Sequence, residues 1–124
     1  MTTIIPAERS PEFGDVYWVD FDPAVGSEQS GRRPALILSH DALHDVSRRT
    51  LICPITSNIR PWPTKIIIPP GCVVSGAILA DQARMVDRGR RYFRFIGRLP
   101  DELTLHVRNR LVAFMGISLP PETS

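Results

Sequence analysis

The stretch GDVYWVDFDPAVGSEQSGRRPALILS, residues 14–39, combines two apolar runs with a long polar connection between them. The runs at residues 16–21 (VYWVDF) and 35–39 (ALILS) are rich in aromatic and branched aliphatic side chains, which favour β-strands. Glycine, proline and aspartate residues occupy the connection, as they do in turns and loops. The stretch therefore predicts a fold that begins with two short strands.

The middle of the chain repeats this alternation of short apolar runs and turn residues. Four further segments are predicted to be strands: residues 50–56, 64–69, 77–81 and 92–97. Twelve prolines, most of them in the connections, fit a small barrel or sandwich better than a helical bundle. The sequence therefore predicts a mainly β domain.

The last segment, PDELTLHVRNRLVAFMG at residues 100–116, has the spacing of a helix instead. Apolar residues recur at every fourth position: Leu103, Val107, Leu111 and Met115. The acidic residues after Pro100 suit a first helical turn, and Gly116 suits the end of a helix. We therefore expect a small β-barrel that is closed or flanked by one C-terminal helix.

The composition is that of an ordinary globular domain. The chain has 124 residues, of which 43% are hydrophobic and 23% charged, and a formal net charge of +2. No apolar run approaches the roughly 20 residues of a membrane span, and the N-terminal sequence lacks the pattern of a secretory signal. Cys53 and Cys72 imply no disulfide framework, and Cys53 alternates with apolar neighbours as a core residue does. These features predict a cytoplasmic protein without a membrane partner.

Arginine supplies fourteen of the fifteen cationic side chains, and Lys65 is the only lysine. The planar guanidinium group matches phosphate oxygens two at a time and stacks on flat rings, although a GC-rich genome would also favour arginine. The segment RMVDRGRRYFRFIGR, residues 84–98, interleaves six arginines with Tyr92, Phe93 and Phe95. This pattern is typical of surfaces that bind single-stranded nucleic acid. A hairpin with an arginine-rich outer face and an aromatic inner face would explain it equally well.

Arg32 and Arg33 stand where the second predicted strand begins. Pro34 fixes its own backbone and restricts Arg33 to extended geometry. A phosphate-binding side chain would be positioned in this way, on a stiff support beside a glycine-flanked loop. The alternative is a solvated pair that protects the edge of a strand from aggregation.

The sequence HDALH spaces His40 and His44 as in the zinc motif H-E-x-x-H, with Asp41 in place of the glutamate. That motif needs a helix long enough to present both rings, and it needs a third ligand. The segment is predicted to be a short loop or a single turn, and His106 has no clear reason to approach it. We therefore expect two surface histidines, no metal site and no cofactor.

Three motifs occur in one order: the opening stretch, then PITSN at residues 54–58, then LADQARMVD at residues 79–87. On these motifs the chain resembles the MazF/PemK family of toxin endoribonucleases, which belong to type II toxin–antitoxin systems, from about Gly14 to Gly116. The resemblance implies an SH3-like small β-barrel with a C-terminal α-helix, assembled as a homodimer. It also implies sequence-specific, metal-independent cleavage of single-stranded RNA (mRNA, rRNA or tRNA). In that reaction the ribose 2′-hydroxyl attacks the adjacent phosphate and leaves a 2′,3′-cyclic phosphate and a 5′-hydroxyl.

The resemblance also assigns roles to single residues. It implies that Arg33 is the catalytic arginine and that Thr56 is its hydroxyl partner. The residues that it places along the RNA are Ser27, Glu28, Gln29, Arg32, Ser57, Asp81, Gln82 and Arg84. A guanidinium fork would stabilise the charge on a five-coordinate phosphorus, and a hydroxyl would add a neutral donor.

The proton acceptor is a separate question, because arginine does not readily lose its proton. A carboxylate is the expected general base, with Glu28 as the first candidate and Asp81 as the second. Some members of the family have a histidine in place of Ser27 and an arginine in place of Leu79. The assignment of acid and base therefore stays open between Glu28, Asp81 and another group.

The expected organisation is one toxin domain over residues 14–118, with an N-terminal extension over 1–13 that could be mobile and a tail over 119–124. The resemblance implies three partners: single-stranded RNA, a second copy of the chain and a cognate antitoxin. The antitoxin is expected to carry an acidic, disordered segment that folds across the groove. The alternative is a non-catalytic binding module on the same barrel, either an RNA binder or a gyrase inhibitor like the CcdB toxins.

Overall fold

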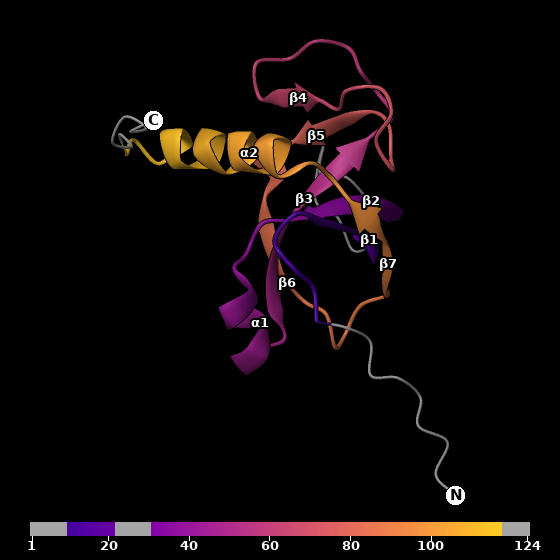
Figure 1. The fold of residues 1–124 in the computed structure, drawn as a ribbon, viewed down its shortest axis with the longest axis vertical. Helices are drawn as coiled ribbons and strands as arrows, with labels where there is room; N and C mark the ends of the chain where they lie inside the picture. The colour runs from indigo at the N-terminus through magenta and orange to yellow at the C-terminus, as the bar shows by residue number, and fades with distance from the viewer. Residues whose placement is uncertain (1–9, 22–30, 118–124) are drawn as a thin grey trace, which may run out of the picture.

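The computed structural model describes residues 10–21 and 31–117. The predicted tail over 119–124 lies outside these ranges, and only residues 10–13 of the predicted N-terminal extension lie within them. In the described residues a single antiparallel sheet is accompanied by one short helix and one long C-terminal helix (Figure 1). The prediction of a mainly β fold with a C-terminal helix is confirmed.

Seven strands make up the sheet. In chain order they are β1 (Asp15–Asp20), β2 (Arg32–Ile37), β3 (Arg49–Thr56), β4 (Lys65–Ile67), β5 (Ala77–Leu79), β6 (Arg84–Asp87) and β7 (Phe93–Arg98). Hydrogen bonds connect them in the order β4-β5-β3-β2-β1-β7, and β6 pairs with β3. These pairings of the described strands do not form a closed cycle, so closure into a barrel stays a prediction.

Each face of the sheet has its own hydrophobic core, because successive side chains of a strand point to opposite faces. One core contains Val16, Leu36, Leu38, Cys53, Ile55, Ile66, Ile68, Ile78, Ala80, Leu99 and Val107. The other contains Tyr17, Val19, Phe21, Ala35, Ile37, Ile52, Val86 and Phe93. Much of the three central strands is therefore buried on both sides, which explains the apolar runs in β1 and β3 and the apolar second half of β2.

The predicted strands correspond to β1, β2, β3, β4, β5 and β7, with shifted ends. β2 begins at Arg32, before the predicted start, because the pairing with β1 extends to the Asp20–Arg32 pair. The sequence did not predict β6, a strand of only four residues. The hairpin interpretation of residues 84–98 is wrong, because β6 pairs with β3 and β7 pairs with β1.

The C-terminal helix, α2 (Asp101–Phe114), extends away from the sheet at its far end (Figure 1). Val107 is fully buried in the first core, whereas Met115 is 66% exposed. The predicted apolar stripe is therefore wrong at Met115, which follows the last helical residue. Gly116 has a φ of 75°, the left-handed conformation typical of a residue that ends a helix.

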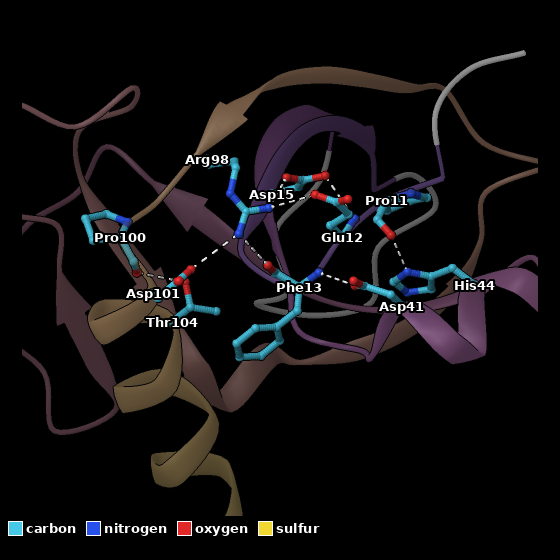
Figure 2. Close-up of polar contacts among 10 residues, drawn as sticks. All are labelled: Pro11, Glu12, Phe13, Asp15, Asp41, His44, Arg98, Pro100, Asp101 and Thr104. Atoms are coloured by element: carbon cyan, nitrogen blue, oxygen red, sulfur yellow. Dashed lines mark hydrogen bonds and ion pairs between the residues drawn. The ribbon is translucent and has the colours of Figure 1, made fainter.

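The HDALH segment forms α1 (Asp41–Val46), a single short helix with His40 as its N-cap. The His40 Nδ1 atom accepts a hydrogen bond from the Ala42 amide at 3.0 Å. His44 is only 3% exposed, so the prediction of two surface histidines is wrong for this residue. Its Nδ1–H donates to the Pro11 carbonyl (Figure 2). Its Nε2 lies 2.6 Å from the Ser39 hydroxyl. Nδ1 of His44 thus ties Pro11, at the start of the described residues, to α1, and Nε2 ties α1 to Ser39 after β2.

Candidate functional site

Thr56 is the last residue of β3 and is 6% exposed. Its Oγ1 accepts a hydrogen bond from the Asn58 amide at 3.2 Å, which tightens the turn that follows the strand. A hydroxyl that accepts one bond still has a proton to donate. Thr56 can therefore act as a neutral hydrogen-bond donor at the end of the strand.

Arg33 lies in β2, the neighbour of β3, and is partly buried. The two strands pair with Ala35 opposite Pro54. This pairing ends at Ala35–Pro54, two residues from Arg33 on one strand and two residues from Thr56 on the other. Arg33 and Thr56, to which the resemblance assigned catalysis, therefore lie on neighbouring strands, each two residues beyond the last paired position.

A cavity of about 340 Å³ adjoins the end of β3. Its lining residues are Thr56, Asn58, Trp62, Thr64, Lys65, Leu79, Asp81 and Gln82. The short 3₁₀ turn η1 (Ala80–Gln82) directly follows β5 and supplies the last two. Three residues predicted from sequence, Thr56, Asp81 and Gln82, therefore share one cavity.

The loop between β3 and β4 contributes Asn58, Trp62 and Thr64 to this cavity, and the sequence prediction included only its start, Ser57 and the PITSN motif. The Lys65 ammonium donates to the carbonyls of Asn58 at 2.9 Å and Arg60 at 3.1 Å. The Asn58 side chain also accepts from the Arg60 amide at 3.0 Å. One available signal was the sequence Pro-Trp-Pro at residues 61–63, which places an aromatic side chain between two rigid residues.

Gly76 allows β5 to approach Thr56 closely. A Cβ atom at this position would lie 2.1 Å from the Thr56 carbonyl oxygen. The φ of Gly76 is 120°, a conformation that other residues rarely adopt. The position of Thr56 therefore depends on a residue without a side chain.

The other predicted residues are placed differently. By strand alternation Arg32 points to the face opposite Arg33, and its Cζ lies 4.0 Å from the centre of the Tyr92 ring. Arg84 pairs with Ile52 and is half-buried on the same face as Arg33. The exposed Ser57 follows Thr56. Ser27, Glu28 and Gln29 lie outside the described residues.

Several arginines of residues 84–98 donate hydrogen bonds to backbone carbonyls of the same chain. Arg88 donates to the carbonyls of Ser47 and His44, both at 2.9 Å, and Arg91 donates to the carbonyl of Asp20 at 2.9 Å. Each of these contacts joins strands or turns distant in sequence. The arginine-rich composition therefore reflects fold stabilisation as well as an exposed basic surface.

Arg98 is the centre of a charged cluster next to the start of α2 (Figure 2). Its Nη1 lies 2.8 Å from Asp15 Oδ1 and 3.2 Å from Glu12 Oε2, and its Nη2 lies 3.3 Å from Asp101 Oδ1. Its Nη2 also donates to the Phe13 carbonyl at 3.1 Å. Burial alone would lower the pKa of Arg98, but the charges and hydrogen bonds of Asp15 and Asp101 raise it above its usual value. The cluster ties β1, β7 and α2 together.

Cys53 is fully buried, as predicted. Burial, and to a smaller extent the negative charge of Asp81, raise the pKa of its thiol from 9.0 to about 12. The thiol is therefore protonated at neutral pH and is a poor nucleophile. Cys53 is a core residue beside the site, not a participant in its chemistry.

No helix within residues 10–21 and 31–117 is long and apolar enough to cross a membrane.

The chain is similar in sequence to known proteins. Residues 12–115 match a family model described as PemK-like, MazF-like toxin of type II toxin–antitoxin system. The chain is 39% identical over 108 residues to the endoribonuclease toxin ChpB of Escherichia coli K12, covering 82% of this chain and 91% of ChpB. It is 38% identical over 76 residues to the endoribonuclease toxin MazF of the same strain, covering 61% of this chain and 68% of MazF.

Solved structures show the same fold. The crystal structure of MazF from Deinococcus radiodurans superposes with a TM-score of 0.83 at 34% identity, covering 89% of this chain and all (100%) of that one. A MazE–MazF structure from the same organism superposes with a TM-score of 0.77 at 32% identity, covering 90% of this chain and 100% of the matched chain.

Proposed function

This chain belongs to the family of PemK-like, MazF-like toxins of type II toxin–antitoxin systems and is a toxin endoribonuclease, and we propose that Arg33 and Thr56 carry its cleavage of single-stranded RNA. The cleavage is sequence-specific and needs no metal ion. One observation supports this proposal: Arg33 and Thr56 lie on the paired strands β2 and β3, each two residues from the last paired position, and Thr56 lines the cavity that also contains Asp81.

The reaction is an internal transfer at phosphorus. The ribose 2′-oxygen forms a bond to the phosphorus and loses its proton to a carboxylate, while the bond from phosphorus to the 5′-oxygen breaks. The leaving 5′-oxygen takes up a proton, so the products are a 2′,3′-cyclic phosphate and a 5′-hydroxyl. Arg33 stabilises the negative charge of the five-coordinate intermediate with two parallel donors, and Thr56 donates to the same group.

The carboxylate that accepts the proton is either Glu28 or Asp81. Asp81 is exposed and lines the cavity together with Thr56. Glu28 comes from the connection between β1 and β2. A Glu28→Gln variant and an Asp81→Asn variant separate the two, because only loss of the general base removes the ascending limb of the pH–rate profile.

An Arg33→Lys variant tests the proposal. Lysine keeps the charge but lacks the planar fork, so we expect kcat to fall by about 10²- to 10³-fold while RNA affinity changes little. Single-turnover rates and dissociation constants on one short RNA measure the two effects. Arg90→Lys is the matched control, because the Arg90 side chain is 86% exposed and its recorded ion pair is with Asp87. Equal losses of rate and affinity in Arg33→Lys would make Arg33 a binding residue.

Cleavage assays with a chelator and with DNA in place of RNA form the second part of this test. Cleavage should continue in EDTA, and DNA of the same sequence should remain intact because it lacks the 2′-hydroxyl. Activity that disappeared in EDTA and returned with a divalent ion would contradict the mechanism. RNA binding without cleavage would instead favour the binding-module alternative.

We also infer that the toxin acts in the cytoplasm and is inhibited by a cognate antitoxin with an acidic, extended segment. The MazE–MazF structure of Deinococcus radiodurans supports an antitoxin partner. Exposed cations such as Arg32 and Arg94 favour an acidic chain that imitates RNA. Co-expression with the neighbouring gene should yield a complex that no longer cleaves RNA. A complex that kept full activity would rule out this mode of inhibition.

A further inference from the structure

We propose that the cavity beside Thr56 is a pocket for one unpaired RNA base, which stacks on Trp62 while Asp81 binds its amino group. The inference rests on the proposed function, because it concerns the nucleotide next to the phosphate that Arg33 and Thr56 would hold. It adds a platform and a selection rule for that nucleotide. Four features of the described residues support it.

The first feature is Trp62 itself. Its side chain is 64% exposed, although it lines the cavity. An indole ring offers a large flat surface, and stacking between bases and aromatic rings is a general mode of binding single-stranded nucleic acid. A base in the cavity would therefore cover apolar surface that now faces water.

The second feature is the rigidity of the loop that carries Trp62. Pro61 and Pro63 restrict the backbone on both sides. The Trp62 carbonyl accepts from the Lys65 amide at 3.0 Å, and the Pro63 carbonyl accepts from Arg110 Nη1 of α2 at 3.0 Å. The platform is thus held before any ligand arrives, which reduces the entropy that binding would cost.

The third feature is an unsatisfied hydroxyl in the cavity lining. Thr64 Oγ1 is buried and has no hydrogen-bond partner within the described part of the chain. Buried polar atoms without partners are rare in folded proteins. A base edge or ribose hydroxyl in the cavity would give this oxygen a partner.

The fourth feature is the chemistry of Asp81. An ionised carboxylate only accepts hydrogen bonds, so it favours a base with an exocyclic amino group, namely adenine, cytosine or guanine. Uracil presents carbonyl oxygens on both sides of its N3–H, and these would approach the carboxylate unfavourably. The pocket should therefore reject uracil at one position near the cleaved bond.

The decisive experiment begins by mapping the cleavage sites of the wild-type chain on a long transcript. The best site is then made as a short RNA with a 2′-deoxyribose at the cleaved position, which binds but is not cut. Trp62→Ala should lower its affinity by about 5- to 150-fold, the range measured for loss of one stacked base. Trp62→Phe should keep most of the affinity, because an aromatic face remains.

Trp18→Ala is the matched control. Trp18 is 41% exposed, lies on β1 and does not line the cavity. The chain has only two tryptophans, so a Trp18→Phe variant leaves Trp62 as the sole indole. Its fluorescence should be quenched when the uncleavable RNA binds.

The selection rule has its own readout. Four RNAs that differ only in the base next to the cut should be cleaved by the wild type with uracil as the poorest substrate. Asp81→Asn should reduce this discrimination. If Asp81 acted only as general base, the variant would lower kcat for all four RNAs by one factor and leave their ranking unchanged.

The outcomes distinguish this inference from the function on which it rests. A wild-type chain that cut no RNA would contradict the proposed function. A wild-type chain that cut RNA, with Trp62→Ala matching it in affinity and sites, would overturn the base pocket alone. Equal losses in Trp62→Ala and Trp18→Ala would also overturn it, because the effect would not belong to this cavity.

Discussion

Arg98 forms an ion pair with the buried carboxylate of Asp15. Asp15 is fully buried, and Arg98, which is 40% exposed, contacts it at 2.8 Å. The Arg90–Asp87 pair is different, since its atoms are 3.7 Å apart and the Arg90 side chain is 86% exposed. Ion pairs of the first kind matter for stability because removal of one partner leaves an unpaired buried charge.

Arg98→Ala should therefore destabilise the domain much more than Arg90→Ala. We expect a loss of roughly 2 to 4 kcal/mol in the first variant, reduced from the fully buried case because water reaches Arg98. The second variant should lose less than about 1 kcal/mol. Urea unfolding at neutral pH measures both. Similar losses in the two variants would contradict the role of Asp15 as a buried partner.

Cys53 should make the stability of the domain depend on alkaline pH. Because burial raises the pKa of its thiol from 9.0 to about 12, the folded state favours the protonated form. This contribution is complete below about pH 9 and is lost as the pH rises toward 12. Unfolding between pH 7 and 11 should show a steeper loss for the wild type than for Cys53→Ala. Cys72→Ala is the control, and it should follow the wild-type slope.

At the scale of elements, the contact between β5 and the end of β3 determines where Thr56 lies. Gly76→Ala places a methyl group against the Thr56 carbonyl and also imposes an unfavourable φ. We expect a destabilisation of more than about 3 kcal/mol and a loss of cleavage. Gly71→Ala shares the positive φ, but its Cβ meets nothing within 4 Å, so it should lose only about 1 to 2 kcal/mol and keep its activity. Thermal melts and cleavage rates compare the two. Equal effects would show that φ alone is responsible.

Elements were predictable from sequence in proportion to their length and regularity. The 14-residue helix α2 and the apolar strands β1 and β3 repeat their patterns often enough to be recognised. The four-residue strand β6 offers too little alternation, and its arginines suggested a surface instead. Alternation also could not show that the central strands have a core on each face, because that depends on how the sheet is covered.

The candidate site was only partly predictable, for a similar reason. Arg33 and Thr56 belong to short motifs, and the pairing of β2 with β3 places them on neighbouring strands. Trp62 was not predicted, because its place in the cavity depends on a loop held by Lys65. His44 was misjudged, because its burial depends on Pro11, which is 33 residues away in sequence, as well as on the nearby Ser39.

At the scale of the whole molecule, the single chain leaves apolar side chains exposed near the end of α2. Phe114, Met115 and Ile117 are 47%, 66% and 54% exposed. A second copy that covered them would remove this surface from water. We therefore predict a homodimer by light scattering, which Phe114→Ser weakens. Val46→Ser, at an 83% exposed position on α1, is the control and should leave the mass unchanged. A fully active monomer would contradict this prediction.

The pairing of β1 with β7 joins two strands that the ribosome synthesises at different times. Val19 pairs with Phe93, so 74 further residues must be synthesised before β1 can pair with β7. At translation rates of about 5 to 20 residues per second, that wait lasts roughly 4 to 15 s. During this interval β7 is absent, so β1 has no partner on the side away from β2 and the sheet is incomplete. We therefore expect the complete sheet, and with it RNA cleavage, only after β7 has been synthesised.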